Sequence, residues 1–160
     1  MKQLDYSLLV SELIDGDTIK LPFILTPANK TIRPLERTII LDTGASNSSF
    51  TKEFLTDHGY GRYTISDKET NTAVGPIKLK TCCVKGIKVA NNFEFPEMTV
   101  NVLEGWNKNK VVGVIGMDIL SQLTFLMSHE AGQFLLTDEK MPELTKLFNR
   151  LTPSSVFSKR

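Results

Sequence analysis

The sequence has few of the residues that mark secreted, metal-binding or membrane proteins. No apolar run approaches the roughly 20 residues that a membrane-spanning helix needs, and the acid-interrupted N-terminus does not resemble a secretory signal. The two cysteines, Cys82 and Cys83, are neighbours, so we expect two free thiols on one strand, one facing each side. The two histidines, His58 and His129, lack metal-ligand spacing. We therefore expect a cytoplasmic protein without a metal or cofactor.

An excess of charge of one sign is also absent. The 160 residues include 19 Lys and Arg against 18 Asp and Glu, for a formal net charge of +1. No basic stripe is present, so we expect neither nucleic acid nor a membrane as a partner. A hydrophobic content of 41% and a charged content of 23% are typical of a globular protein. The length suits one folded domain, and we find neither repeats nor a linker.

Short apolar segments separated by turn residues predict a mostly β fold. Apolar residues alternate over Ile19–Leu25, which predicts a strand. Two short apolar strands are expected at Thr38–Leu41 and Val111–Ile115. The segments Phe125–Met127 and Phe134–Thr137 are typical of a closing hairpin.

Two helices are expected in addition to the strands. The first covers 52–58, with Thr51 as its N-terminal cap and Gly59 at its end. The second is amphipathic and lies within 141–151, where leucine and phenylalanine recur at helical spacing after Pro142.

The most informative stretch is ILDTGASNSSF, in which an apolar strand runs directly into Asp42. A glycine two positions later lets the backbone turn sharply, so that its N–H approaches the carboxylate just presented by the strand. This pattern predicts an exposed carboxylate in a rigid hydrogen-bonding cradle. One such carboxylate hydrolyses a peptide bond poorly, whereas two that share a proton can activate water and polarise the carbonyl together.

The sequence resembles the retropepsin-like aspartic proteases in two segments, Leu41–Ser46 and Val114–Gln122. The second is similar to the apolar-apolar-Gly-x-Asp/Asn element that follows the last core strand of that family. The resemblance covers roughly 17–137, which leaves an N-terminal extension at 1–16 and a C-terminal helix and tail at 138–160. It implies a closed antiparallel barrel with a short helix after the second motif, to which this chain adds the C-terminal helix.

The family works as a homodimer, and this chain carries a single Asp-Thr-Gly. The resemblance therefore implies that Asp42 pairs with Asp42 of a second copy, across a twofold axis, to form an aspartic endopeptidase. Thr43 would brace the dimer and Gly44 would donate from its backbone. Ala45 and Ser46 would contact the peptide substrate.

A flap over the substrate is also implied, and its best candidate is the segment 70–76, with Val74 and Gly75 near the hairpin tip. Retroviral members usually carry an interacting Asp and Arg where Ser46 and Met117 stand. Their joint absence makes the chain look more like a cellular or bacterial relative. Ala45 offers no hydroxyl to stabilise an ionised dyad, which favours activity at mildly acidic to near-neutral pH.

Other interpretations of these residues stay open. Asp42 could form an ordinary turn, and the chain could be a catalytically weak dimerisation or peptide-binding module with the same fold. Asp118 is interpreted as a structural cap on a helix that starts at Ile119. Asp15 and Asp17 faintly resemble the paired acids of haloacid dehalogenase-type phosphotransferases, although a turn fits the β-rich context better.

Overall fold

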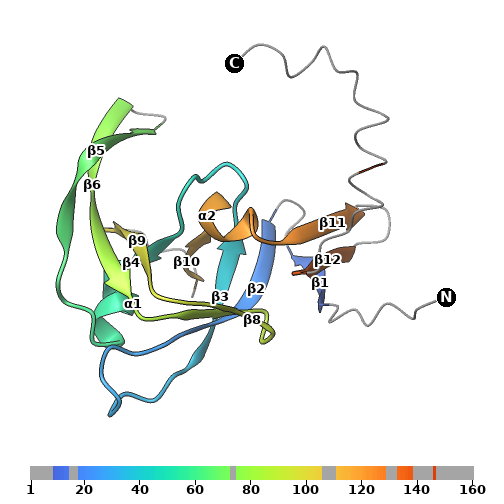
Figure 1. Cartoon of the computed structure of the whole chain (residues 1–160), viewed down its shortest axis with the longest axis horizontal. Coiled ribbons are helices and arrows are strands. Elements are labelled where there is room, and N and C mark those ends of the chain that lie inside the picture. The colour runs from blue at the N-terminus through green and yellow to red at the C-terminus, as the bar shows by residue number, and fades with distance from the viewer. Residues whose placement is uncertain are drawn as a thin grey trace.

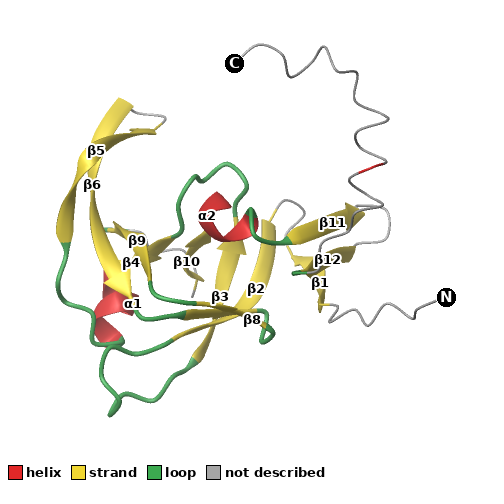
Figure 2. Ribbon diagram, in the orientation of Figure 1, coloured by secondary structure: helices red, strands yellow, loops and turns green. Residues whose placement is uncertain are grey.

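The computed structural model of the chain describes residues 9–14, 18–72, 75–105, 111–128, 133–138 and Lys146. Strands dominate these residues, and the helices are short (Figures 1 and 2). The strands are β1 (Leu9–Ile14), β2 (Thr18–Leu25), β3 (Glu36–Leu41), β4 (Ser49–Thr51), β5 (Thr64–Thr72), β6 (Gly75–Val84), β7 (Ile87–Val89), β8 (Phe93–Phe95), β9 (Met98–Leu103), β10 (Val111–Ile115), β11 (Thr124–Ser128) and β12 (Gln133–Thr137). The helices are α1 (Lys52–Asp57) and α2 (Met117–Leu120).

The strands follow one hydrogen-bonded path, β11-β12-β1-β2-β3-β10-β4-β9-β6-β5, with β7 and β8 attached to β2. The expectation of a mostly β fold is confirmed, but the closed antiparallel barrel is wrong. Over the described residues the path is open, because the β5–β6 hairpin extends away from the body while β11 lies at the far end (Figure 1). Two pairs, β10 with β3 and β4 with β9, are also parallel.

Strand β10 is inserted between β3 and β4, which are consecutive in the sequence. This insertion requires a close approach at Gly113, where an added Cβ would lie 2.1 Å from the backbone oxygen of Ser49. Only glycine fits at that separation. The consequence is that the loop between β3 and β4 is held at the end of β10.

The core follows from the alternation of apolar residues along the strands. In β2, Leu21, Phe23 and Leu25 are fully buried, as the sequence pattern predicts. Phe23 lies 5.1 Å from Phe50 and 5.9 Å from Phe54 between ring centroids, which ties β2 to β4 and α1. Each such side chain contributes about 1.5–3 kcal/mol through burial.

Helix α1 confirms its sequence prediction to within a residue. The hydroxyl of Thr51 accepts a hydrogen bond from the N–H of Phe54 at 3.3 Å. Gly59 follows the C-terminal cap with φ of +81°, a left-handed conformation that favours glycine. His58 is buried at that cap, and its Nδ1 lies 2.9 Å from the carbonyl oxygen of Phe54.

Tyr60 joins three loops on the side of α1. Its hydroxyl donates to the carbonyl of Thr26 and accepts from the N–H of Lys85 at 3.0 Å. Burial raises the pKa of Tyr60 above its ordinary value of 10.0, since the phenolate would lose its hydration. The ring therefore belongs in the folded protein in its neutral form.

The edges of the fold give mixed outcomes for the sequence predictions. The hairpin of β11 and β12 is confirmed by five antiparallel residue pairs. Cys82 is buried and Cys83 exposed on β6, both as free thiols, which confirms the expected alternation. Strand β1, which pairs with β12 and β2, was not predicted from the sequence. The predicted helix over 141–151 lies outside the described residues, apart from Lys146.

Candidate active site

The loop 42–48 carries the Asp-Thr-Gly motif at the end of β3. The N–H of Asp42 donates to the carbonyl of Ile115 at 3.0 Å, so the pairing of β3 with β10 continues to the first residue of the loop. The N–H of Gly44 donates to Asp42 Oδ1 at 2.8 Å. This bond fixes the carboxylate against its own turn, in the cradle that the sequence motif predicts.

Gly44 packs closely against the carboxylate of Asp42. A Cβ added to Gly44 would lie 3.2 Å from Asp42 Oδ1, tighter than most Cβ contacts. A side chain at this position would require the Asp42 carboxylate to move by a few tenths of an ångström.

Helix α2 donates backbone hydrogen bonds to the same loop. The N–H of Met117 donates to the carbonyl of Ala45 at 2.8 Å, and the N–H of Asp118 donates to that of Ser46 at 3.1 Å. A Cβ added to Gly116 would lie 2.6 Å from the carbonyl carbon of Asn47 and would push the loop away. The two motifs identified in the sequence thus meet in space and form one unit.

Ser48 is a site residue that sequence reasoning missed. It is fully buried, and its hydroxyl donates to Asp118 Oδ1 at 2.7 Å while its N–H donates to Asp118 Oδ2 at 2.8 Å. Its Oγ also accepts from the N–H of Gly116 at 3.0 Å. No local sequence signal marks Ser48, because the partners lie about 70 positions away along the chain.

Asp118 is structural, as expected, but not as the cap that the sequence suggested. Helix α2 begins at Met117 with Gly116 as N-terminal cap, so Asp118 lies inside its first turn. Its carboxylate accepts from the N–H of Ile119 at 2.9 Å in addition to holding Ser48. Through its hydrogen bonds with Ser48, this carboxylate links α2 to the loop 42–48.

The loop presents its polar edge to solvent. Asp42 and Ala45 are half-buried, whereas Thr43, Gly44 and Ser46 are exposed. The loop carries one carboxylate, and a single carboxylate cannot supply the acid and the base of hydrolysis at the same time. One chain therefore presents one fixed carboxylate at this loop.

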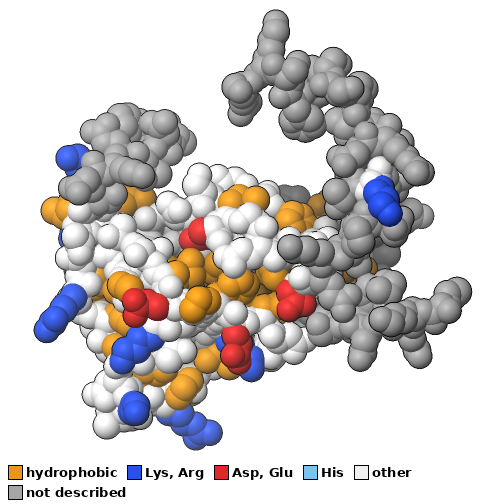
Figure 3. All heavy atoms as spheres, viewed as in Figure 1, with side chains coloured by type: hydrophobic (Ala, Val, Ile, Leu, Met, Phe, Trp, Pro, Cys, Tyr) orange, Lys and Arg blue, Asp and Glu red, His pale blue; other side chains and the backbone are white. Residues whose placement is uncertain are grey.

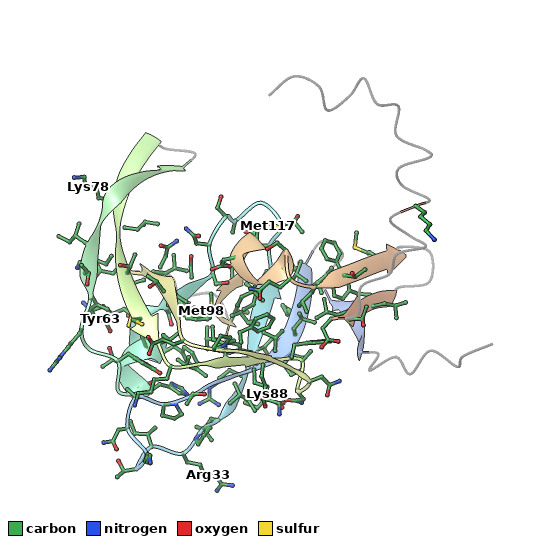
Figure 4. The ribbon with its side chains drawn as sticks, viewed as in Figure 1. Arg33, Tyr63, Lys78, Lys88, Met98 and Met117 are labelled. Carbon is green, nitrogen blue, oxygen red and sulfur yellow. The ribbon has the colours of Figure 1, made fainter. Side chains whose placement is uncertain are left out.

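The predicted flap segment corresponds to the turn between β5 and β6. Gly75 begins β6 and pairs with Thr72, the last residue of β5. Val74 lies outside the described residues. The hairpin, which carries Lys78, extends upward at the left of the view in Figures 1 and 4, and α2, with Met117, lies on the upper side near the middle.

The remaining candidate residues form no second site within the part of the chain that the structure describes. No group of three or more His, Cys, Asp or Glu side chains there could hold a metal ion. No helix in that part is long and apolar enough to cross a membrane. Asp15, Asp17 and His129 lie outside the described residues.

The chain is similar to known proteins in both sequence and fold. Residues 31–122, which contain both motifs, match the family model described as "gag-polyprotein putative aspartyl protease". No curated protein matches the chain.

Among solved structures, the chain is similar to a retropepsin-like aspartic protease from Rickettsia conorii. The TM-score is 0.63 at 16% identity, over 82% of this chain and 91% of that one, which establishes the fold. It also aligns with the EIAV protease complexed with the inhibitor HBY-793, at a TM-score of 0.45 and 17% identity, over 68% of this chain and 91% of that one. Since the family match spans more than half of the 160 residues, the chain belongs to the retropepsin-like aspartic protease family.

Proposed function

We propose that the protein is a homodimeric aspartic endopeptidase in which the Asp42 carboxylates of two copies form the catalytic dyad. The observation that carries this proposal is the fixed, solvent-facing carboxylate of Asp42. Gly44 holds it from one side, and the end of β10 positions its backbone from the other. Such rigidity is costly unless the position of the carboxylate matters, as it does in catalysis.

The dimer is needed because one copy supplies one acid. A twofold axis through the loop 42–48 brings the same patch of each copy face to face, so that each Asp42 meets its equivalent. Two carboxylates at hydrogen-bond distance retain one proton between them. Thr43, which is exposed beside Asp42, would brace the partner's loop through its hydroxyl.

The shared proton defines the reaction. The ionised carboxylate removes a proton from water as the water oxygen attacks the peptide carbonyl carbon, and the protonated carboxyl donates its proton to the carbonyl oxygen. The tetrahedral diol intermediate then collapses: the C–N bond breaks, the amine leaves with the proton of the protonated carboxyl, and a diol hydroxyl returns its proton to the other carboxylate as the product acid forms. Each cycle returns the dyad to one proton on two carboxylates.

The substrate is expected to bind as an extended peptide. Backbone hydrogen bonds of the kind found between strands can hold a peptide of any sequence, and a β-rich cleft can provide them. Ala45 and Ser46 would form the floor of this cleft. Gly75, the first residue of β6, and its sequence neighbour Val74 would belong to a flap that closes over the peptide.

The test is peptide cleavage from acidic to neutral pH, with mass determination in parallel. We expect Asp42→Asn to abolish cleavage while leaving the dimer intact, since Asn keeps the shape but supplies no shared proton. The matched control is Asp57→Asn, an exposed carboxylate at the end of α1, which should retain full activity. Dimers that bind peptide without cleaving it would instead identify a binding module.

A further inference from the structure

The hairpin of β5 and β6 is joined to the rest of the sheet over a short stretch. Strand β6 pairs with β9 from Thr81 to Val84, whereas its residues 75–80 pair, among the described strands, with β5 alone. Strand β5 is the last strand of the sheet path. Beyond Thr81 the hairpin therefore projects from the body, as Figure 1 shows.

The pairing within the hairpin is interrupted just beyond this junction. Ile65 pairs with Lys80 and Glu69 pairs with Lys78, so three residues of β5 lie opposite one residue of β6. A bulge of this kind disrupts the ladder of hydrogen bonds and bends the strand. Strand pairing alone therefore fixes the angle between the hairpin and the body poorly.

Three charged side chains meet at the same junction. The Oε1 atom of Glu104 lies 2.9 Å from Lys80 Nζ and 3.3 Å from Lys52 Nζ. Lys80 belongs to the hairpin, Lys52 begins α1, and Glu104 directly follows β9. This ion triad connects the hairpin to the body through one carboxylate oxygen.

The ion triad lies where the pairing between strands ends. Lys52 and Glu104 each come directly after the last paired residues of β4 and β9. Lys80 is the first residue toward the hairpin tip beyond the last pair of β6 with β9, which joins Thr81 to Asn101. The triad thus adds a contact between hairpin and body beyond the level at which their backbones pair.

The charges of the triad make Glu104 its central member. Because Lys52 and Lys80 contact the same oxygen, their ammonium groups lie within about 6 Å of each other and would repel without the acid between them. Hydrogen bonds from Lys80 and then from Lys52 lower the pKa of Glu104 below its ordinary value of 4.5, so the carboxylate is ionised at mildly acidic to neutral pH. Figure 3 shows further Lys and Arg side chains along the edge of the molecule that carries the hairpin.

We propose that Glu104 is a positioning residue that holds the β5–β6 hairpin in its closed position by bridging Lys80 of the hairpin to Lys52 of the body. All three side chains are about half exposed, so the contact can break and form again as the hairpin moves. The inference rests on the proposed function, in which this hairpin is the flap that closes over the peptide.

The first test is a comparison of KM with kcat in Glu104→Gln, which keeps the size of the side chain and removes its charge. We expect KM for a peptide to rise about fivefold at low salt with kcat nearly unchanged, because closure is weakened while Asp42 is untouched. The difference from wild type should shrink in about 0.5 M NaCl, which screens exposed charges. Glu94→Gln is the matched control, since it removes the acid of another exposed ion pair, 3.2 Å from Lys88, and should leave KM unchanged.

Exchange of the two charges separates an ionic role from a merely structural one. The double variant Lys80→Glu with Glu104→Lys keeps opposite charges on the hairpin and the body. We expect it to restore most of the wild-type KM, whereas Lys80→Glu alone, which places two acids side by side, should raise KM.

The position of the hairpin can be measured without any cleavage. Nitroxide labels at Lys78→Cys on the hairpin and Ser121→Cys at the end of α2, in a Cys83→Ser background, report the distance between the two elements by pulsed electron resonance. Labelled chains are diluted into an excess of unlabelled chain, so that a dimer carries one labelled copy. We expect a narrow distribution of distances with Glu104, a broader one in Glu104→Gln, and a narrow one again in the charge exchange.

The outcomes separate this inference from the protease function. A raised KM and a broadened distribution in Glu104→Gln, both restored by the charge exchange, support the proposal. If Glu104→Gln matches Glu94→Gln in both measurements, or if the exchange restores neither, the role of Glu104 is overturned and the protease function stands. If wild type cleaves no peptide, the proposed function fails, and the distances alone decide whether Glu104 holds the hairpin.

Discussion

Ser48→Ala tests the link between the two motifs. The substitution removes the hydroxyl that joins Asp118 on α2 to the N–H of Gly116 at the end of β10. It keeps the N–H of Ser48, which donates to the other oxygen of Asp118. The change is small in volume, so its effect reports on the hydrogen bonds and not on packing.

The magnitude follows from what is left unpaired. A hydrogen bond to a charged group contributes about 1.5–3 kcal/mol, and a buried N–H without an acceptor costs about 1–3 kcal/mol. Asp118 keeps two donors, the N–H groups of Ser48 and Ile119, which reduces the total. We expect the free energy of unfolding to fall by about 3 kcal/mol.

Urea unfolding followed by circular dichroism, at one fixed protein concentration, measures this change. With a denaturant slope of about 2 kcal/mol/M, the midpoint should move down by about 1.5 M. Ser121→Ala, an exposed serine at the end of α2, is the control and should shift stability by less than about 0.5 kcal/mol. A Ser48→Ala midpoint as close to wild type as that of the control would refute the assigned role of this hydroxyl.

Three further predictions concern other parts of the chain. Gly113→Ala should prevent folding or lower the free energy of unfolding by more than about 3 kcal/mol, because the new Cβ meets rigid backbone. The control is Gly61→Ala, whose added Cβ has no atom within 4 Å and which should leave urea unfolding unchanged. Tyr60→Phe should lower the free energy of unfolding by about 2 kcal/mol at pH 8, because the N–H of Lys85 loses its acceptor. Since the pKa of Tyr60 is raised in the folded protein, wild type loses this advantage as the pH rises above 10.0. A difference in unfolding free energy between the two proteins that widens above that pH would contradict us. Ala45→Ser should move the acid limb of the pH–rate profile down by about one unit through a hydrogen bond to the ionised dyad, and an unmoved limb would count against this.

Features with local causes could be predicted from the sequence. Helix α1 has its cap and its stop within eight positions, at Thr51 and Gly59, and both act as expected. Strand β10 was predicted with its observed bounds, because a short apolar run ends at Gly116. The cradle of Asp42 was predicted for the same reason, since its donor is only two residues away.

Features that depend on distant partners could not be predicted. Strand β1 is interrupted by Ser11 and Glu12 and owes its existence to β12, at the other end of the described chain. The open sheet and its parallel pairs result from the order in which strands meet, which apolar periodicity does not encode. Ser48 escaped notice because a buried serine has the same sequence appearance as an exposed one.

The central claim is that two Asp42 side chains act together, and a subunit-mixing titration tests it most directly. Wild type and Asp42→Asn are unfolded together in urea, refolded at constant total concentration, and assayed for peptide cleavage against the fraction of wild type. If only dimers with two aspartates are active, activity follows the square of that fraction, so an equal mixture retains about one quarter of it. A straight line, with one half retained, would show that each Asp42 works alone and would contradict the account.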